Sequence, residues 1–478
     1  VVMPINSFLY PGAKVTPDYE VANSCMFNSA DSPKMVKTLG TPTSTKIGTI
    51  SCWIKRGSIG VEQHFLGTAQ DGNDRCSIGF DDSVEGELHI VQEDSGSYSY
   101  RFKTTARYRD PSAWMHLCLA IDTTQASASN RVKIYINGTQ VTDFETETQP
   151  SQDTVIRYGI SGEEFVVGAK LGGGGSYGNF YNGYLAEVVF IDGLQLTPTS
   201  FGEFDSDTPT VFKPIDVSGL TFGNNGFYLD FEDSSNLGND ANGGTDLTES
   251  NLAATDQATD TPTNNFCTMN PLDKKTGGTY TFSEGNLQVE QDILRGTLSN
   301  FGMTAGKWYA EAKFVSTNSD SCRIGIVGIS NTDNDNPGKP ATGYVYDQDG
   351  NKSNNNTAAS YGDTYSTGDI IGIAVDLDNL KIYFSKNGTF QDSGDPTSGS
   401  TGTGAAYTIT AASGTPAGAY FFTHCDNADT NKVFWNFGSP AFAISSGNAD
   451  DNGYGNFEYD VPAGYLALCT KNLGSDGG

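Results

Sequence analysis

The stretch from Gly368 to Phe390, GDIIGIAVDLDNLKIYFSKNGTF, most constrains how this chain can fold. An apolar run of strand length ends at the polar cluster Asp376–Asn379, and a second run rich in β-branched and aromatic residues follows it. Asn387 and Gly388 tolerate positive φ and therefore suit a tight turn. The pattern predicts two antiparallel strands with a turn between them and a turn after them.

The same sequence pattern occurs once more, far upstream. Residues 117–122 read LCLAID and residues 132–139 read VKIYINGT, so A-x-D, K-I-Y and N-G-T recur in the same order. The repeat predicts two modules built on one plan rather than a short-period solenoid. Convergence of unrelated antiparallel sheets on such patterns is the alternative, and two sandwich domains are expected in either case.

Composition and charge limit the classes of protein and partner. A chain of 478 residues can form two or three domains, and its 23 Tyr, 27 Phe and 57 Gly without helical periodicity predict an all-β fold. The net charge of −29 argues against nucleic acid and anionic membranes as partners, because both attract Lys and Arg clusters. Such a charge suits a soluble protein on the surface of a particle.

The cysteines and the apolar runs predict neither a metal site nor a membrane segment. No C-x-x-C pair occurs, and most thiols are expected to be free and buried, although a Cys267–Cys469 bridge stays open. The start of the chain lacks the pattern of a signal peptide, and no run reaches the ~18 apolar residues of a membrane helix. The eight cysteines are Cys25, Cys52, Cys76, Cys118, Cys267, Cys322, Cys425 and Cys469.

The first module has three ordered segments that together resemble a family. They are AWMHLCLAI at 113–121, VKIYINGT at 132–139 and NGYLAEVVFIDG at 182–193. In this order they resemble a laminin G/pentraxin-type, concanavalin A-like domain, which implies a jelly roll of two antiparallel sheets over residues 18–233. Residues 1–17 are expected to form an N-terminal arm, and the Asp-, Asn-, Thr- and Gly-rich residues 234–266 a polar connector.

The second module resembles a SPRY domain. KWYAEAKF at 307–314, RIGIVGIS at 323–330, the stretch around residues 368–390 and VFWNFG at 433–438 carry that resemblance. It implies a second bent β-sandwich over residues 267–478, in a family of binding modules rather than enzymes. The sequence departs from the family in two long inserted loops, residues 331–367 and 391–408, so the ligand cannot be transferred from it.

The pairing of the two modules resembles virion-associated proteins of bacteriophages. Those proteins are tail-fibre or head-surface components, so the resemblance implies a protein made in the host cytoplasm and displayed on the virion surface. Other virion proteins are then the expected partners. This is an analogy of architecture, and it does not supply a mechanism.

Catalytic groups are hard to find in the sequence. Jelly-roll glycan hydrolases need two carboxylates on one face of a sheet, and Asp230 and Glu232 share such a face. The third acid of the glucanase motif is missing, because position 234 is serine. Glu187 and Asp192, five residues apart, would face opposite sides of a regular strand. The protein is therefore predicted not to be an enzyme, with a jelly-roll hydrolase as an alternative.

Calcium is the one cofactor that the resemblance suggests. Laminin G and pentraxin relatives bind it through oxygen ligands of their loops, which suits a hard cation. No D-x-D-x-D-G-type loop is present, and no ligand set is assigned. Candidate acids are Asp81 with Asp82, Asp230, Glu232 and Asp233 with Asp240, and Asp333 with Asp335.

Aromatic residues in polar loops are the candidates for ligand binding, because glycans stack on aromatic rings and bond to neighbouring polar groups. The alternative is that these rings pack the loops onto the sandwich. In the second module the candidates are Tyr344, Tyr346, Asp347, Asn351, Tyr361 and Tyr365; in the first they are Tyr98, Tyr100, Tyr177, Phe180 and Tyr181.

Together these patterns predict an all-β protein of two concanavalin A-like antiparallel β-sandwiches in series. Its expected function is non-enzymatic: a tail fibre or head decoration that binds a host-surface glycan or receptor through sandwich loops. A purely structural assembly protein without a glycan ligand is the second hypothesis. A homo-oligomer, for example a trimer, would amplify weak sugar contacts, although no coiled-coil heptads are present.

Overall fold

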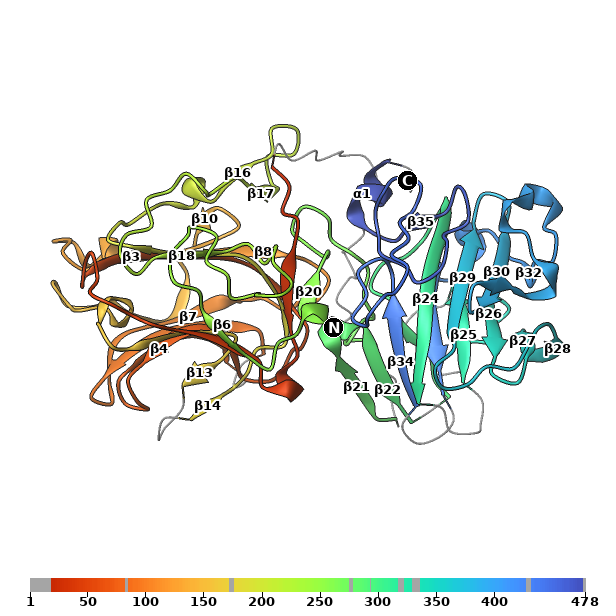
Figure 1. The fold of residues 1–478 in the computed structure, drawn as a ribbon, viewed down its shortest axis with the longest axis horizontal. Coiled ribbons are helices and arrows are strands. Elements are labelled where there is room, and N and C mark those ends of the chain that lie inside the picture. Colours follow the sequence, from red (N-terminus) through yellow and green to blue (C-terminus); the bar gives the residue numbers. More distant parts are fainter. Residues whose placement is uncertain are drawn as a thin grey trace. The chain divides into compact units, whose positions relative to one another are not determined.

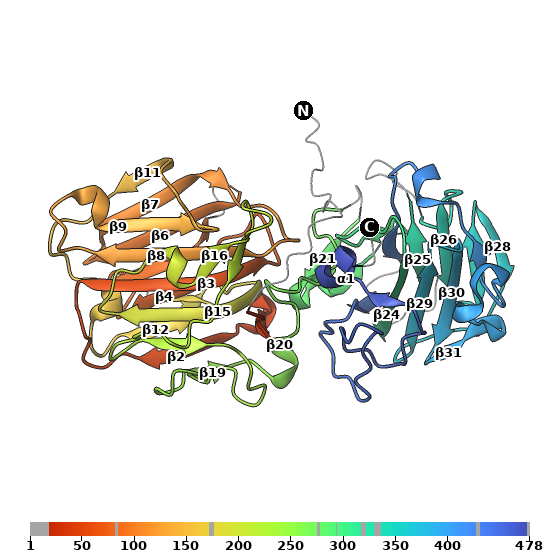
Figure 2. The ribbon, with the colours of Figure 1, turned by 90° about the horizontal axis from the view of Figure 1, so that it is seen from above.

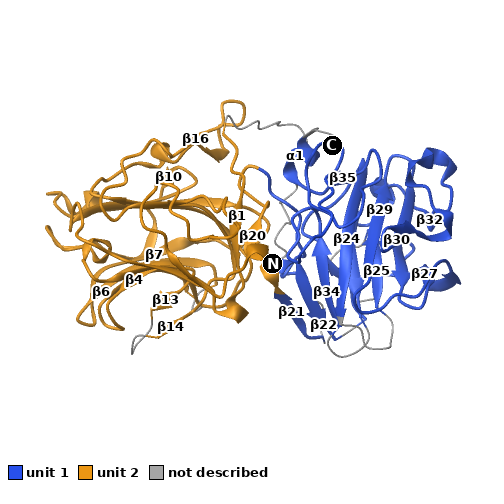
Figure 3. Ribbon diagram, viewed as in Figure 1, with its two compact units in different colours: residues 1–16, 264–282, 286–478 blue, residues 17–263, 283–285 orange. Residues whose placement is uncertain are grey.

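A computed structural model describes residues 19–81, 85–171, 176–274, 278–292, 294–316, 322–328, 336–426 and 431–475. The chain divides into two compact units, shown in orange and blue in Figure 3. The described residues of 19–263 and 283–285 form the N-terminal sandwich, and the described residues of 264–282 and 286–475 form the C-terminal sandwich. The predicted N-terminal arm, residues 1–17, lies outside the described residues.

Two antiparallel sheets form the N-terminal sandwich (Figures 1 and 2). Sheet A has the order β10 (Thr139–Gln140), β9 (Val132–Ile136), β8 (Met115–Asp122), β3 (Ile47–Arg56), β15 (Gly183–Asp192), β1 (Ser24–Phe27) and β20 (Gln257–Ala258), with β18 (Phe227–Leu229) paired to β15. Sheet B has the order β11 (Phe144–Thr148), β7 (Ser97–Arg107), β6 (Glu87–Asp94), β5 (Arg75–Asp81), β4 (Gln63–Ala69), β12 (Glu164–Val167), β2 (Lys34–Thr38) and β19 (Thr248–Ser250). Two short ribbons complete it: β13 (Lys170–Leu171) with β14 (Tyr177–Gly178), and β16 (Gly202–Phe204) with β17 (Phe212–Pro214).

Alternation along the strands builds the core between sheets A and B. In β6, Leu88 and Ile90 belong to one large buried apolar cluster, while Glu87 and His89 occupy the alternate positions. Because successive side chains of a strand point to opposite faces, one face of sheet B is apolar and the other is polar. The polar face therefore lies outside the sandwich core.

The expected connector, residues 234–266, is for the most part not a connector. β19 pairs with β2 and β20 pairs with β1, so this segment extends both sheets of the N-terminal sandwich. Two of its few apolar residues, Leu237 and Leu247, are buried in the core of the N-terminal sandwich. The buried Asp260 carboxylate lies 2.5 Å from the Lys55 ammonium and fixes the end of the segment.

The C-terminal sandwich also has two sheets. Sheet C has the order β21 (Tyr280–Ser283), β22 (Gln288–Gln291), β34 (Asn431–Asn436), β24 (Lys307–Ser316), β29 (Ile370–Asp376), β30 (Lys381–Lys386) and β31 (Thr389–Phe390), with β32 (Tyr407–Thr408) beside β30 and β35 (Leu466–Ala467) parallel to β24. Sheet D has the order β23 (Thr297–Leu298), β33 (Phe421–Cys425), β25 (Arg323–Val327), β26 (Gly343–Asp347), β27 (Asn351–Asn354) and β28 (Thr357–Ser360). The predicted class, two antiparallel β-sandwiches in series, is confirmed.

Helices are few and short in the described part of the chain. The α-helix is α1 (Thr470–Ser475). No described helix has the length and apolar character needed to cross a membrane. The 3-10 turns are Ser29–Asp31, Ala128–Asn130, Arg157–Gly159, Pro198–Ser200, Ala254–Asp256, Glu284–Asn286, Gln391–Ser393, Pro396–Thr401 and Ala412–Gly414.

Candidate functional site

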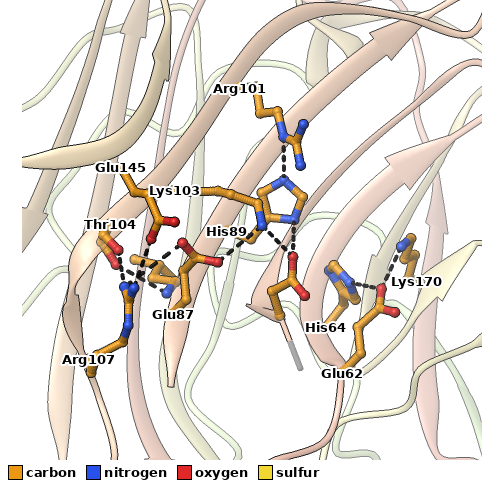
Figure 4. A network of polar contacts seen from close by, with 12 residues as sticks. Glu62, His64, Glu87, His89, Arg101, Lys103, Thr104, Arg107, Glu145 and Lys170 are labelled. Atoms are coloured by element: carbon orange, nitrogen blue, oxygen red, sulfur yellow. Dashed lines mark hydrogen bonds and ion pairs between the residues drawn. The ribbon is translucent and has the colours of Figure 1, made fainter. Parts of the chain in front are cut away.

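Charged side chains gather on the outer face of sheet B, across its neighbouring strands β4, β5, β6, β7 and β11 (Figure 4). They alternate with Phe80, Leu88 and Phe102, which point into the core. We call this surface the charged face. It comprises Glu62, His64, Asp81, Glu87, His89, Arg101, Lys103, Arg107, Glu145 and, from β13, Lys170.

Lys103 holds two carboxylates from neighbouring strands. Its Nζ lies 2.7 Å from Oδ2 of Asp81 and 3.1 Å from Oε2 of Glu87. Burial opposes the charged form of this ammonium, yet the two bonds outweigh burial and raise the pKa of Lys103. The other oxygen of Glu87, Oε1, is buried without a hydrogen-bond partner and lies 3.8 Å from Arg107 Nη1.

His64 and Lys170 both bond to Glu62. Oε1 of this carboxylate lies 3.0 Å from His64 Nε2 and 2.8 Å from Lys170 Nζ. The bond to His64, aided by Lys170, lowers the pKa of Glu62 to about 2 despite partial burial. Burial lowers the pKa of His64, so its ring is neutral at pH 7, with Nε2–H donating to Glu62. Nδ1 of His64 is then a buried acceptor without a partner.

His89 is a second neutral imidazole on the same face. Burial, together with the nearby His64, Arg101 and Lys103, lowers the pKa of His89 to about 3. Nε2 of His89 can therefore accept the Nε–H of Arg101 at 3.4 Å, and Nδ1 lies 4.0 Å from Asp81 Oδ2. Gly79 lies between the two histidines, because it pairs with His64 on one neighbouring strand and with His89 on the other. A Cβ at Gly79 would lie 2.5 Å from His64 Nδ1. The glycine therefore makes room for the ring of His64.

This arrangement suits binding better than proton transfer. Its carboxylates are held by cations, and burial lowers the pKa of both histidines, that of His89 to about 3. General acid–base catalysis favours groups with pKa values near the working pH. Fixed charges of both signs beside unpartnered polar atoms instead offer hydrogen bonds to a polar ligand.

The structure places most of the predicted ligand-binding residues inside the sandwiches. Tyr346, for example, packs on Phe384 with ring centroids 5.5 Å apart, and the Tyr365 hydroxyl donates to two main-chain carbonyls. Since Tyr344 and Tyr346 alternate with Val345 in β26, both rings lie on one face of sheet D, the inner one. A buried ring has no face to offer a sugar. The buried candidates are Tyr100, Tyr181, Tyr344, Tyr346, Asp347, Tyr361 and Tyr365.

Four predicted residues keep exposed surface, but they are not together. Tyr98 is 48% exposed and lies beside Arg101 of the charged face. Tyr177 is half-buried, with its hydroxyl bonded to Glu164. Asn351 belongs to the other sandwich, where its side chain bonds to Asp349 at 2.8 Å. Phe180 is half-buried and pairs with His64 through the main chain.

The acids proposed for hydrolysis or calcium have structural partners instead. Asp230 accepts the main-chain N–H of Glu232 at 3.0 Å, and Asp192 accepts N–H groups from three loop residues. Asp240 binds Lys37 at 3.2 Å. Among the described residues no group of three or more His, Cys, Asp or Glu side chains could hold a metal ion. Asp82, Asp333 and Asp335 lie outside the described part.

Sequence reasoning missed most of the charged face. Its signal is present as alternation: Glu87 and His89 flank Leu88 in ELHIVQ, and Arg101 and Lys103 flank Phe102 in YRFKT. Polar residues at alternate positions of two consecutive predicted strands indicate one polar face of a sheet. The pairing of these strands, which brings the charges together, comes from the structure.

Family models match both sandwiches. Residues 31–199 match the concanavalin A-like lectin/glucanases superfamily, and residues 307–416 match the SPRY domain. No curated protein matches the chain.

Three solved structures are similar to parts of this chain. The SPRY domain of human HERC1 is 15% identical, with 35% of this chain and 96% of that chain covered and a TM-score of 0.27. A heptameric SAP-like pentraxin from Limulus polyphemus is 15% identical, with 37% and 80% covered and a TM-score of 0.28. A protein from Bacteroides ovatus described as carbohydrate-binding is 14% identical, with 49% and 61% covered and a TM-score of 0.34. The chain thus carries a concanavalin A-like domain followed by a SPRY domain.

Proposed function

We propose that the protein is a non-enzymatic binding protein whose N-terminal sandwich holds a glycan on the charged face. One observation carries the proposal: this face combines paired fixed charges with buried polar atoms that have no hydrogen-bond partner, namely His64 Nδ1 and Glu87 Oε1. Buried polar atoms are normally satisfied, so such atoms mark places for a ligand or ordered water. The superfamily match, which includes lectins, supports this function.

Lys103 provides the test, because it links β5, β6 and β7 at the centre of the face. Replacing it by Met removes the ammonium that orients Asp81 and Glu87. We expect Lys103→Met to weaken glycan binding roughly tenfold or more on a glycan array and in titration calorimetry. Lys133→Met, a half-buried position on β9 of the other sheet, is the matched control and should bind normally. Unchanged binding by a folded Lys103→Met protein would contradict the proposal.

Hydrolysis is the competing activity for the same face. Asp81 and Glu87 both lie near one ammonium, whereas a glycosidase needs one carboxyl that keeps its proton. The purified protein is therefore expected to release no reducing sugar from the glycans that it binds. Release that disappears in Asp81→Asn would establish the hydrolase instead.

The proposed setting is the surface of a bacteriophage virion, as a tail fibre or head decoration in homo-oligomeric form. The resemblance of the module order to virion-associated proteins and the net charge of −29 are the reasons for proposing it. Mass spectrometry and electron microscopy of purified particles test it, and absence from the particles would overturn it. Presence on particles without any glycan binding would favour the assembly protein.

A further inference from the structure

A bulge at one end of sheet B brings an exposed tyrosine to the charged face. Between Gln92 opposite Tyr100 and Glu93 opposite Tyr98, β7 carries one extra residue, Ser99. An extra residue shifts the alternation of a strand by one position. Tyr100 therefore points into the core, whereas Tyr98 is 48% exposed.

Arg101 lies against this tyrosine and lacks a carboxylate partner. Its guanidinium carbon is 4.6 Å from the centroid of the Tyr98 ring, and its Nε–H points to His89 at 3.4 Å. In the described part of the chain no Asp or Glu pairs with Arg101, unlike the other cations of the charged face, Lys103, Arg107 and Lys170. The adjacent Glu93 is held by Arg75 at 3.1 Å.

An unpaired guanidinium is unusual in a chain of net charge −29, where carboxylates are abundant. Nε of Arg101 donates to His89, whose ring is neutral at pH 7, and the two terminal nitrogens have no hydrogen-bond partner among the described residues. A guanidinium fork matches the two oxygens of a carboxylate. Beside it, the tyrosine ring supplies an aromatic surface for the apolar face of a sugar.

We propose that Arg101 and Tyr98 bind the carboxylate and ring of an acidic sugar, so that the ligand of the charged face is a uronate-type glycan. This inference rests on the proposed function and specifies its ligand class. Arg101 sets the preference for the carboxylate, and Tyr98 adds affinity for the sugar ring.

Oligogalacturonate and its fully methyl-esterified form provide the test, because esterification removes the charge and keeps the sugar. We expect the full-length protein to bind the acid form and to lose roughly tenfold or more in affinity for the ester. Arg101→Met should remove that preference, and Arg101→Lys should restore it only in part, since an ammonium lacks the fork. Tyr98→Ala should weaken both forms. Arg109→Met, at an arginine 43% exposed, is the matched control for the lost charge.

The outcomes separate this inference from the proposed function. Equal binding of acid and ester, or an unchanged preference in Arg101→Met, overturns the acidic ligand and leaves glycan binding intact. If a glycan array shows no binding of acidic, sulfated or neutral glycans, the proposed function fails with it. If sulfated glycans bind and oligogalacturonate does not, the inference that the ligand carries a carboxylate is wrong. Melting temperatures near that of the wild type show that each variant is folded.

Discussion

Glu187 is a carboxyl group whose titration departs strongly from its ordinary behaviour. It sits at a register shift of β15 with a φ of +49°, a conformation that few side chains other than Asn and Asp adopt. Burial is the main cause that raises its pKa to about 8, against the hydrogen bonds from Tyr228 and Tyr19, and the nearby Asp230 and Glu232 add to the rise. The Tyr228 hydroxyl is 2.8 Å from Glu187 Oε2.

A raised carboxyl pKa makes stability depend on pH with a definite sign. Because the unfolded chain ionises Glu187 near pH 4.5 and the folded protein only near pH 8, the unfolded state is increasingly favoured between these values. Stability contributed by the protonated form is complete below about pH 4.5 and is lost as pH rises through 8. The full difference is on the order of 5 kcal/mol.

Glu187→Gln keeps a neutral hydrogen-bonding group at this position and removes the titration. We expect the variant to lose less stability than the wild type between pH 5 and 8, and to be the more stable of the two at pH 8.5. Urea unfolding followed across that range measures the effect. Glu147→Gln, at an exposed position of β11, should keep the wild-type pH profile. Parallel profiles for Glu187→Gln and wild type would contradict the pKa shift.

At the scale of elements, one hairpin device recurs in both sandwiches. Asn387 in the turn between β30 and β31 has a φ of +49°, and its side-chain oxygen accepts the N–H of Ile370 at 2.9 Å. Asn137, between β9 and β10, has a φ of +46° and accepts the N–H of His116 at 2.7 Å. The Asn387 turn is thus bonded to the start of β29, and the Asn137 turn to the start of β8. The repeated N-G-T pattern therefore has a structural role.

Asn387→Ala and Asn137→Ala should each destabilise the sandwich that contains them. Each change leaves a main-chain N–H without its partner and places alanine at positive φ, for a loss of about 2 kcal/mol in the free energy of unfolding. Asn355→Ala is the matched control, because its φ is also +49° and its side chain makes no hydrogen bond to the described residues. Comparing the variants by urea unfolding separates the contribution of the side-chain hydrogen bond from that of alanine at positive φ. Equal losses at Asn387 and Asn355 would show that the side-chain bond contributes nothing.

Alternation and turn residues were enough to predict the sheets, and loop composition was not enough to predict the site. Asn-Gly and the acid clusters fix where strands end, so the two hairpins could be predicted. Whether a tyrosine faces inward depends on the partner sheet, and Tyr346 and Tyr365 fill a space that only the other sheet defines. The bulge at Ser99 is not visible in the sequence, yet it separates Tyr98 from Tyr100. Predicting the charged face would require knowing how five strands pair and in which register.

At the scale of the whole molecule, all eight cysteines are buried thiols outside any disulfide, in both sandwiches. Cys267 and Cys469 are therefore not bridged to each other. Burial raises the pKa of Cys76 and of Cys469 to about 12, so almost no thiolate forms there at neutral pH. Because the thiolate is the reactive form, the folded protein should be inert to thiol reagents.

Thiol titration tests this prediction on the intact chain. We expect no rapid reaction of the native protein with a disulfide reagent at pH 7.5, and eight reactive thiols after denaturation without reductant. The melting temperature should be the same with and without dithiothreitol, since no cross-link restricts the unfolded chain. Denatured protein pretreated with reductant gives the reference count. Six thiols in the unreduced sample would reveal one disulfide, and a lower melting temperature in reductant would show that the fold depends on it.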